Sequence, residues 1–242
     1  MSTIVSAFIY EDRKNCKTLD EYYQYGNYLL ECNVKKVIFL DQTMHNYITQ
    51  KGEINTSLTH LEVIDKDELY LFKELNNMSS FHITDNAEKN TRQYIIVQCL
   101  KTEFVSRAID ISPFNSEQFV WIDFGIKHVC DIPRNMFNNY LITLSEKVYS
   151  NVRIGGIWDT SNNYNLNILT DVHWFFAGGV FGGSKNHLLL FNDHVKKKCM
   201  ELINRYHTLT WEVNIWYLIW KENPSLFDIY KCDHNCTLLI MY

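Results

Sequence analysis

Two short apolar runs, separated by one amphipathic stretch, constrain the fold of this chain most strongly. Residues 3–10 (TIVSAFIY) and 35–41 (KKVIFLD) each read as a buried strand that ends in polar residues. Between them, Thr18 and Glu21 have the spacing of a capping box, and apolar or aromatic residues continue to Leu30, which predicts a helix. A strand, a helix and a strand with short connections form a βαβ unit, so we predict a parallel sheet.

Strands and helices also alternate in the middle of the chain. A short strand is predicted over residues 60–64, and a longer apolar strand over 119–125 (FVWIDFG). Residues 85–110 form one long helical pattern, which Asp85 and Glu88 open at capping spacing.

The second half of the chain continues in the same way. Strands and turns alternate over residues 151–185, and two helices follow over 184–206 and 210–223. The tail is predicted as two short strands, over 227–230 and 236–242. Without repeats or a flexible linker, one α/β domain is the simplest account.

Composition narrows the class of protein. A chain of 242 residues with 46% apolar residues is ample for a sizeable buried core. A net charge of −5 argues against a nucleic-acid partner, and nothing in the composition indicates an oligomeric state. Seven cysteines without a CxxC pair favour free thiols in a reducing compartment. Because we find no signal peptide and no transmembrane segment, we expect a cytoplasmic protein.

Asp123 is the first candidate for chemistry, because it follows the apolar strand FVWI and precedes Gly125. Ligands of open parallel sheets gather at the carboxyl ends of the strands, where this carboxylate could hold Mg²⁺ or Mn²⁺ on a diphosphate. The alternative is that Asp123 caps the following turn. Lys101 and Arg13 could each approach a phosphate, or could simply be solvent-exposed.

Residues 173–185 (HWFFAGGVFGGSK) hold four of the nine glycines of the chain. Paired glycines let the backbone press close to a ligand, and the neighbouring aromatic residues offer faces for sugar rings or bases. The spacing matches neither GxGxxG nor a P-loop. The alternative is a tight, buried strand–turn–helix junction, with Ser184 as the cap of the helix.

Two further candidates lie near the C-terminus. Glu212, beside Trp211, falls in the first turn of a helix, where a carboxylate is favoured in any protein but where it could also grip a sugar hydroxyl. His234, between Cys232 and Cys236, could belong to a metal site, although a lone histidine is more often structural.

Taken together, these motifs resemble the bacterial HtrL/YibB-like family of expected glycosyltransferases. The resemblance is carried by residues 90–101, 113–129 (PFNSEQFVWIDFGIKHV), 176–183 (FAGGVFGG), 210–216 (TWEVNIW) and 233–235 (DHN). Beyond that family, the layout is similar to GT-A-fold nucleotide-sugar transferases.

The resemblance implies a single GT-A-like, Rossmann-like α/β domain with a mostly parallel central sheet flanked by helices. Residues 1–125 would form the nucleotide-binding half, and residues 126–242 the half that holds the acceptor and the donor sugar.

The resemblance also implies a role for each matching position. The residues that bind the nucleotide and the donor would be Phe8, Tyr10, Arg13, Lys101, Trp121, Ile122 and Gly125. The residues near the donor sugar and the acceptor would be Ala177, Gly178, Gly179 and Trp211. Asp123 and Glu212 would be catalytic, and Asp123 and His234 would hold Mn²⁺ or Mg²⁺.

We therefore expect a glycosyltransferase that moves a sugar from a nucleotide diphosphate, with a UDP-sugar as the expected donor, to a hydroxyl of a glycan or other acceptor. Retention and inversion of configuration both remain open. Gly125 stands where the DxD motif of these enzymes has its second acid, which weakens the predicted metal site. The alternatives are a catalytically inactive GT-A module that binds a glycan or nucleotide, and a glycoside hydrolase that uses Asp123 and Glu212.

Overall fold

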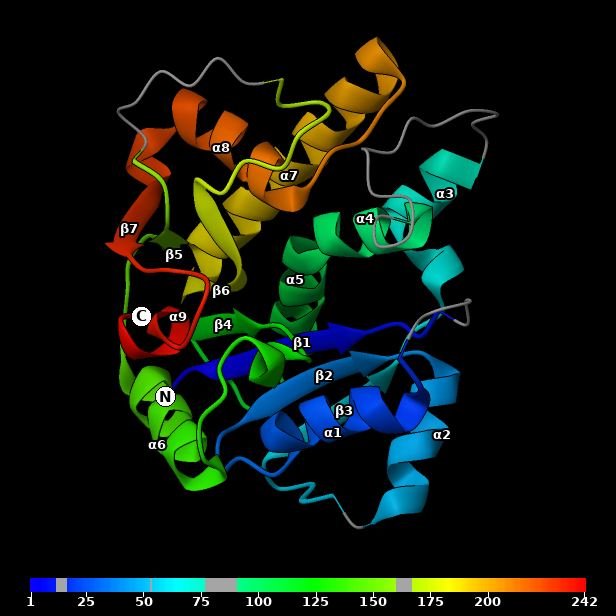
Figure 1. Ribbon diagram of the computed structural model, residues 1–242, viewed down its shortest axis with the longest axis vertical. Coiled ribbons are helices and arrows are strands. Elements are labelled where there is room, and N and C mark those ends of the chain that lie inside the picture. The colour runs from blue at the N-terminus through cyan, green and yellow to red at the C-terminus, as the bar shows by residue number, and fades with distance from the viewer. Residues whose placement is uncertain (12–16, 53, 77–90, 160–166) are drawn as a thin grey trace.

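The computed structural model describes residues 1–11, 17–52, 54–76, 91–159 and 167–242. Its centre is a seven-stranded sheet in the order β3-β2-β1-β4-β6-β5-β7 (Figure 1). The strands are β1 (Thr3–Phe8), β2 (Lys36–Leu40), β3 (Thr59–Val63), β4 (Gln118–Ile122), β5 (Val152–Gly156), β6 (Phe176–Ser184) and β7 (Phe227–Lys231).

The sheet is mostly parallel. Strands β3, β2, β1 and β4 run parallel to one another, as do β5 and β7, whereas β6 is antiparallel to both β4 and β5. The predicted βαβ unit is confirmed, because β1 and β2 pair in parallel on either side of helix α1 (Leu19–Leu30). The Thr18–Glu21 capping box opens that helix as the spacing predicted.

Helices cover both faces of the sheet. The further helices are α2 (Gln42–Lys51), α3 (Tyr70–Asn76), α4 (Arg92–Cys99), α5 (Lys101–Ile111), α6 (Arg134–Glu146), α7 (Lys185–Tyr206), α8 (Glu212–Glu222) and α9 (Thr237–Ile240). Three short 3₁₀ turns are η1 (Lys66–Glu68), η2 (Ile126–His128) and η3 (Pro224–Leu226).

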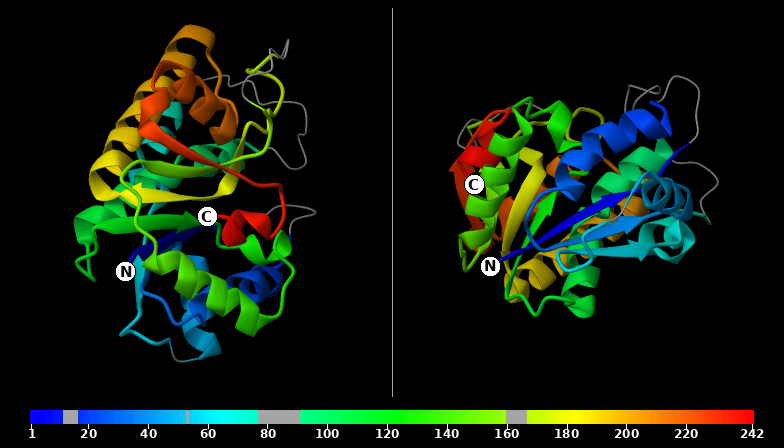
Figure 2. Two further views of the ribbon diagram at one scale, coloured as in Figure 1. Left: turned by 90° about the vertical axis from the view of Figure 1, so that its left-hand side faces the viewer. Right: turned by 90° about the horizontal axis from the view of Figure 1, so that it is seen from below.

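Alternation along the strands divides the buried side chains into two cores. Successive strand residues point to opposite faces, so Val5 and Val37 pack under α4, α5, α7 and α8, while Ile4 and Ile38 pack under α1, α2, α6 and α9. The two layers of helices lie on opposite sides of the sheet, with α7 and α9 as examples (Figure 2). The predicted single α/β domain with a mostly parallel sheet between helices is therefore confirmed.

The glycine-rich stretch is a strand. Residues 176–184 form β6, which leads directly into α7, so the predicted turn is absent from this stretch. Ser184 does stand at the N-cap of α7, but its hydroxyl donates to Ser150 O at 2.7 Å instead of capping the helix. A Cβ on Gly182 would lie 2.3 Å from the Tyr242 hydroxyl, so this glycine allows the C-terminal tyrosine to pack on the sheet.

The predicted helix over residues 85–110 is wrong, because the described part of it forms two helices that meet at Leu100. Cys99, Leu100 and Lys101 are all buried, which one straight helix with a single buried face does not allow. Thr91 caps α4 through Tyr94 N. The predicted capping residues Asp85 and Glu88 lie outside the described residues.

The predicted strand over residues 236–242 is also wrong, since residues 237–240 form the short helix α9. The apolar run there is too short for periodicity to separate a strand from a helix. The Asn235 side chain accepts from Thr237 N at 2.9 Å, which starts a turn. Helices α2 and α3 lie in a region for which the sequence predicted only β3.

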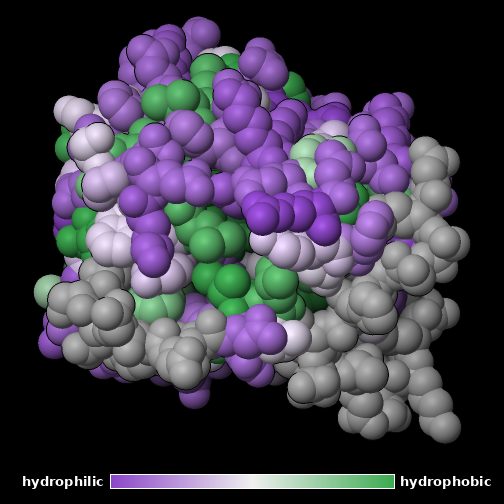
Figure 3. Space-filling model, turned by 90° about the horizontal axis from the view of Figure 1, so that it is seen from above, coloured by the Kyte–Doolittle hydropathy of each residue, from purple (hydrophilic) through white to green (hydrophobic). Residues whose placement is uncertain are grey.

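Within the described ranges, we find no helix that is both long and apolar enough to cross a bilayer. On the face seen in Figure 3, hydrophilic residues surround a smaller group of apolar ones. Apolar atoms on a surface are ordinary for a folded domain.

Asn214, which is fully buried in α8, fixes the segment that leads into β6. Its amide nitrogen lies 2.7 to 2.9 Å from Ile168 O, Asp171 O and Thr210 Oγ1, of which its two N–H groups can serve two at a time, and its carbonyl oxygen accepts from His173 N at 2.9 Å. One side chain thus holds three backbone groups of this segment, of which His173 N is buried.

We predict that Asn214→Leu lowers the free energy of unfolding by at least about 3 kcal/mol, because it leaves buried donors and acceptors unpaired. Chemical denaturation measures the loss. The matched control is Asn46→Leu on the exposed face of α2, which is expected to change stability by less than about 0.5 kcal/mol. Equal effects of the two substitutions would contradict this assignment.

Candidate functional site

Lys101 connects four elements at the carboxyl end of β4. As the first residue of α5, it donates to Asp123 Oδ2 at 3.3 Å, with Oδ1 of the same carboxylate 2.9 Å away, to Gly178 O in β6 at 3.0 Å and to Glu212 Oε1 in α8 at 3.0 Å. An ammonium group has three N–H donors, so these three acceptors satisfy it completely. Lys101 and Glu212 are only 3% and 4% exposed.

The electrostatics of this cluster are dominated by the two carboxylates. Burial alone would lower the pKa of Lys101, but the charges of Asp123 and Glu212 outweigh it and raise the pKa above its ordinary value. Because the folded-state pKa is raised, the stabilisation is fully present below about pH 10.4, the ordinary lysine pKa, and is lost as the pH rises further. Two carboxylates and one ammonium leave the cluster with one net negative charge.

Asp123 joins this buried cluster to the solvent. Its Oδ1 also accepts from Trp121 Nε1 at 2.7 Å, and its side chain is 34% exposed. The following turn is closed by the backbone carbonyl of Asp123, which accepts from Ile126 N at 2.9 Å. The carboxylate is therefore not the cap of that turn, which was the alternative interpretation.

Gly178 is required by the cluster itself. A Cβ at this position would lie 2.2 Å from Glu212 Oε1 and 3.3 Å from Lys101 Nζ. At Gly179 the nearest atom would be the flexible end of Ile126, at 3.0 Å. The sequence predicted that the glycine pair lets the backbone come close to a ligand. In the structure, the groups that lie close to Gly178 are the side chains of Glu212 and Lys101.

Two cavities meet at the cluster. The larger, of about 220 Å³, lies at the carboxyl ends of β1 and β4, and the smaller, of about 130 Å³, lies between β6 and α8. Both are lined by Tyr94, Gln98, Lys101, Asp123 and His128.

Several predicted site residues line these cavities. The larger cavity includes Phe8, Lys101, Trp121, Asp123 and Gly125. The smaller cavity includes Lys101, Asp123, Gly178, Gly179, Trp211, Glu212 and His234.

Other predicted residues lie elsewhere. Ile122 and Ala177 line neither cavity, because strand alternation directs their side chains into the core that also contains α6 and α9. Tyr10 does not line them either; its N–H donates to the Asp41 carboxylate and its ring packs on Tyr22. Arg13 lies outside the described residues.

Some lining residues were not predicted. Tyr22 and Tyr25 on α1 and Tyr94 on α4 line the larger cavity, and His128 in η2 lines both. The tyrosines lie in ordinary amphipathic helices and the histidine in a turn, so no local pattern in the sequence marked them as site residues. The usable signal for His128 was its place in the turn after the strand that carries Asp123.

The predicted metal ligands do not form a divalent-cation site on their own. Asp123 and His234 both line the smaller cavity, but the Asp123 carboxylate is paired with the Lys101 ammonium. No three His, Cys, Asp or Glu side chains come together as possible metal ligands in the described part of the chain. Mg²⁺ and Ca²⁺ take six or more ligands that are mostly oxygen, so this set of donors does not fit such an ion.

Fold and site together define an α/β protein with a two-part cleft at the carboxyl ends of its parallel strands, which is where such sheets bind ligands. The chain belongs to the HtrL/YibB family, described as "Bacterial protein of unknown function (HtrL_YibB)", whose pattern matches residues 2–238. It is similar to Protein HtrL of Escherichia coli K12, with 21% identity over 93% of this chain and 86% of that protein.

Solved structures with similar backbones include two transferases. Mouse xyloside xylosyltransferase 1 aligns with 96% of this chain and 85% of its own, at 13% identity and a TM-score of 0.47. A glycosyltransferase involved in glycosylation of the major capsid of PBCV-1 aligns with 95% of this chain and 80% of its own, at 10% identity and a TM-score of 0.46.

We predict that Gly178→Ala destabilises the protein by about 2 kcal/mol or more, because the added methyl group forces Glu212 away from Lys101. Gly179→Ala is the matched control, with an expected loss below about 1 kcal/mol since only the end of Ile126 has to move. Urea denaturation of both variants measures the difference. If Gly178→Ala proves as stable as Gly179→Ala, the claim that Glu212 and Lys101 pack too closely on Gly178 to admit a side chain is wrong.

We also predict that Lys101→Met costs about 3–5 kcal/mol, because it leaves a buried carboxylate without its counter-charge. The double variant Lys101→Met/Glu212→Gln is expected to recover part of that loss, since it removes the unpaired charge. Lys185→Met, which breaks an exposed pair with Glu117, serves as the control and is expected to cost less than about 1 kcal/mol. Strict additivity of the two cluster substitutions would rule out the pairing.

Proposed function

We propose that this protein is a glycosyltransferase that uses a nucleotide-diphosphate sugar. The observation that carries the proposal is the unsatisfied Oε2 of Glu212, which is buried and has no hydrogen-bond partner among the described residues. A buried carboxylate oxygen without a donor is costly, and Glu212 lines the smaller cavity. A hydroxyl of a sugar bound there would supply the missing donor.

The larger cavity suits the nucleoside part of the donor. Phe8, Tyr22 and Tyr25 line it, and aromatic rings stack on bases with little dependence on sequence. Its place at the carboxyl ends of β1 and β4 is the usual ligand site of an open parallel sheet. We propose a UDP-sugar as the donor.

The smaller cavity suits the sugar and the acceptor hydroxyl. Trp174 and Trp211 line it, with their rings edge to face at 6.2 Å, and the Trp174 ring lies 5.3 Å from that of His234. Indole faces pack on the apolar faces of sugar rings. Gly178 and Gly179 form another part of its lining.

The proposed reaction forms a bond between the acceptor oxygen and the anomeric carbon while the bond from that carbon to the diphosphate oxygen breaks. The diphosphate leaves with the electron pair, and the acceptor gives up its proton. The partly exposed Asp123 carboxylate is our proposed acceptor of this proton, and Glu212 would stabilise positive charge at the anomeric carbon. Lys101 would hold both carboxylates in position.

A second candidate is a binding module without turnover. It is favoured by the complete internal pairing of Lys101, which leaves this ammonium no free donor for a phosphate. A glycoside hydrolase is less favoured, because only the two acids support it, whereas the cavity at the carboxyl ends of β1 and β4 is the usual ligand site of a nucleotide-binding sheet.

The proposal predicts that UDP binds to the wild-type protein and that Asp123→Asn keeps this affinity within about threefold, because it removes a negative charge beside the diphosphate, while it abolishes the release of UDP from a donor sugar. The control is Asp131→Asn, which changes a carboxylate that is 91% exposed. Calorimetric titration with and without Mn²⁺ measures both affinities, and Mn²⁺ is expected to change them less than about threefold because the protein donors do not fit it. Failure of every nucleoside diphosphate to bind would refute the proposal.

Turnover separates the enzyme from the binding module. With a panel of UDP-sugars, we expect slow release of UDP from at least one donor, and loss of this release in Glu212→Gln. Binding of nucleotide without release from any donor, with or without added glycan acceptors, would support the binding module instead.

A further inference from the structure

The proposed donor carries a negatively charged diphosphate, but the central lysine is already fully paired. All three donors of Lys101 are satisfied by Asp123, Gly178 and Glu212, and the cluster has a net negative charge. A diphosphate bound at the junction of the two cavities therefore needs other positive or hydrogen-donating groups from the protein.

His128 is placed to be such a group. It is exposed, it lies in η2 directly after the turn at Asp123, and it lines both cavities. Its Nδ1 is hydrogen-bonded to Gly125 O. Because a carbonyl oxygen can only accept, Nδ1 must carry the proton, and Nε2 is the ring nitrogen left for a ligand.

Lys17 and Tyr25 extend this group on the same side of the larger cavity, and both line it. The Lys17 ammonium lies 5.7 Å from the centre of the Tyr25 ring, and the His128 ring meets the same ring edge to face at 5.9 Å. A lysine and a histidine are thus arranged around one tyrosine on the wall of the larger cavity, and the histidine also lines the smaller one.

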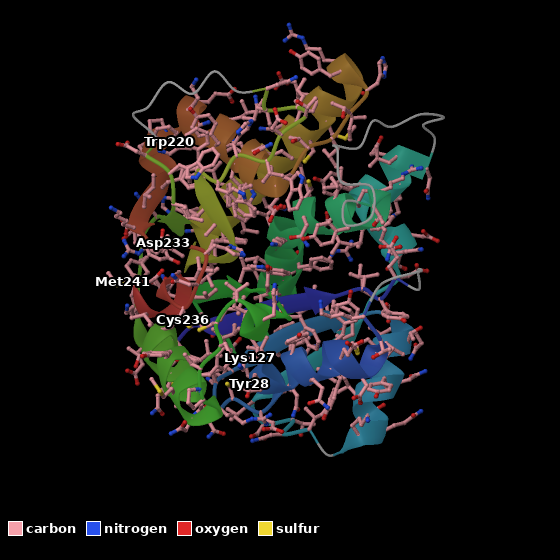
Figure 4. The ribbon with its side chains drawn as sticks, in the orientation of Figure 1. Tyr28, Lys127, Trp220, Asp233, Cys236 and Met241 are labelled. Carbon is pink, nitrogen blue, oxygen red and sulfur yellow. The ribbon has the colours of Figure 1, made fainter. Side chains whose placement is uncertain are left out.

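The neighbouring lysine does not belong to this group. Lys127 lies over the Tyr28 ring at 4.9 Å and pairs with Asp131, and it lines neither cavity (Figure 4). Of these two neighbouring residues in η2, only His128 can therefore contact a ligand in the cleft, because the Lys127 side chain lies against α1.

We propose that His128, together with Lys17, forms the diphosphate subsite of this cleft. His128 binds as the imidazolium: with a second proton on Nε2 it donates from Nε2 to a phosphate oxygen, while Nδ1–H still donates to Gly125 O and fixes the orientation of the ring. The Lys17 ammonium approaches from the other side of Tyr25. This inference rests on the proposed function and adds to it two side chains that bind the phosphates and do not contact the base or the sugar.

The test compares ligands with and without the diphosphate. Calorimetric titration with UDP, uridine and inorganic pyrophosphate is done on the wild-type protein and on His128→Ala, His128→Gln and His128→Asn. The glutamine amide reaches the position of Nε2, whereas the asparagine amide reaches only that of Nδ1. His60→Ala is the control, because His60 lies on β3 and pairs with Glu62.

For His128→Ala and His128→Asn, we expect UDP and pyrophosphate to bind at least about fivefold more weakly, with the affinity for uridine unchanged. His128→Gln is expected to keep UDP affinity within about threefold of the wild type, because it retains the donor. Lys17→Met is expected to weaken UDP and pyrophosphate in the same way, while His60→Ala changes nothing.

Two results would overturn the subsite. Either UDP binds equally well to the wild type and to His128→Ala, or uridine and UDP weaken by the same factor, which would place His128 at the base. Both results leave the proposed function intact. If the wild type binds pyrophosphate but no nucleotide, the proposed function fails while the anion site stands, and binding of neither ligand overturns both.

Discussion

The ion pairs of one buried lysine hold together the elements that surround the cleft. Lys101 begins α5, and its ammonium connects the end of β4 through Asp123, β6 through Gly178 and α8 through Glu212. The partners are far apart in the sequence, and removing any one leaves a buried charge or carbonyl without its complement. The glycine at position 178 follows from this pairing, because any side chain there would occupy the place of the Glu212 carboxylate.

The same pairing divides the cleft chemically. On one side, aromatic residues of β1 and α1 line the larger cavity, which we propose for the nucleoside, and on the other, tryptophans and the Glu212 carboxylate line the smaller one. The two carboxylates that pair with Lys101 carry more charge than its ammonium. The positive charge that a diphosphate requires therefore has to come from other residues that line the cleft, which we call its rim. His128 and Lys17 occupy that rim, which is why we assign the phosphates to them and the orientation of Asp123 and Glu212 to Lys101.

The sequence predicted what depends on local patterns. The capping box of Thr18 and Glu21 and the apolar strands on either side of α1 specify the βαβ unit without long-range information. Asp123 and Glu212 were selected as acids at element ends, and the structure brings both to one lysine. The pairing of Lys101 with a residue 111 positions away is a tertiary contact that no local pattern reports. For the same reason, the need for Gly178, the break at Leu100 and the position of His128 became visible only in the folded chain.

A crystal structure of the protein with bound UDP tests the central claim most directly. The account predicts the base in the larger cavity beside Tyr22 and Tyr25, the diphosphate within hydrogen-bonding distance of His128 Nε2, and Lys101 still paired with Asp123 and Glu212. UDP bound away from the carboxyl ends of β1 and β4, or a Lys101 that leaves its carboxylates to contact the phosphates, would contradict it.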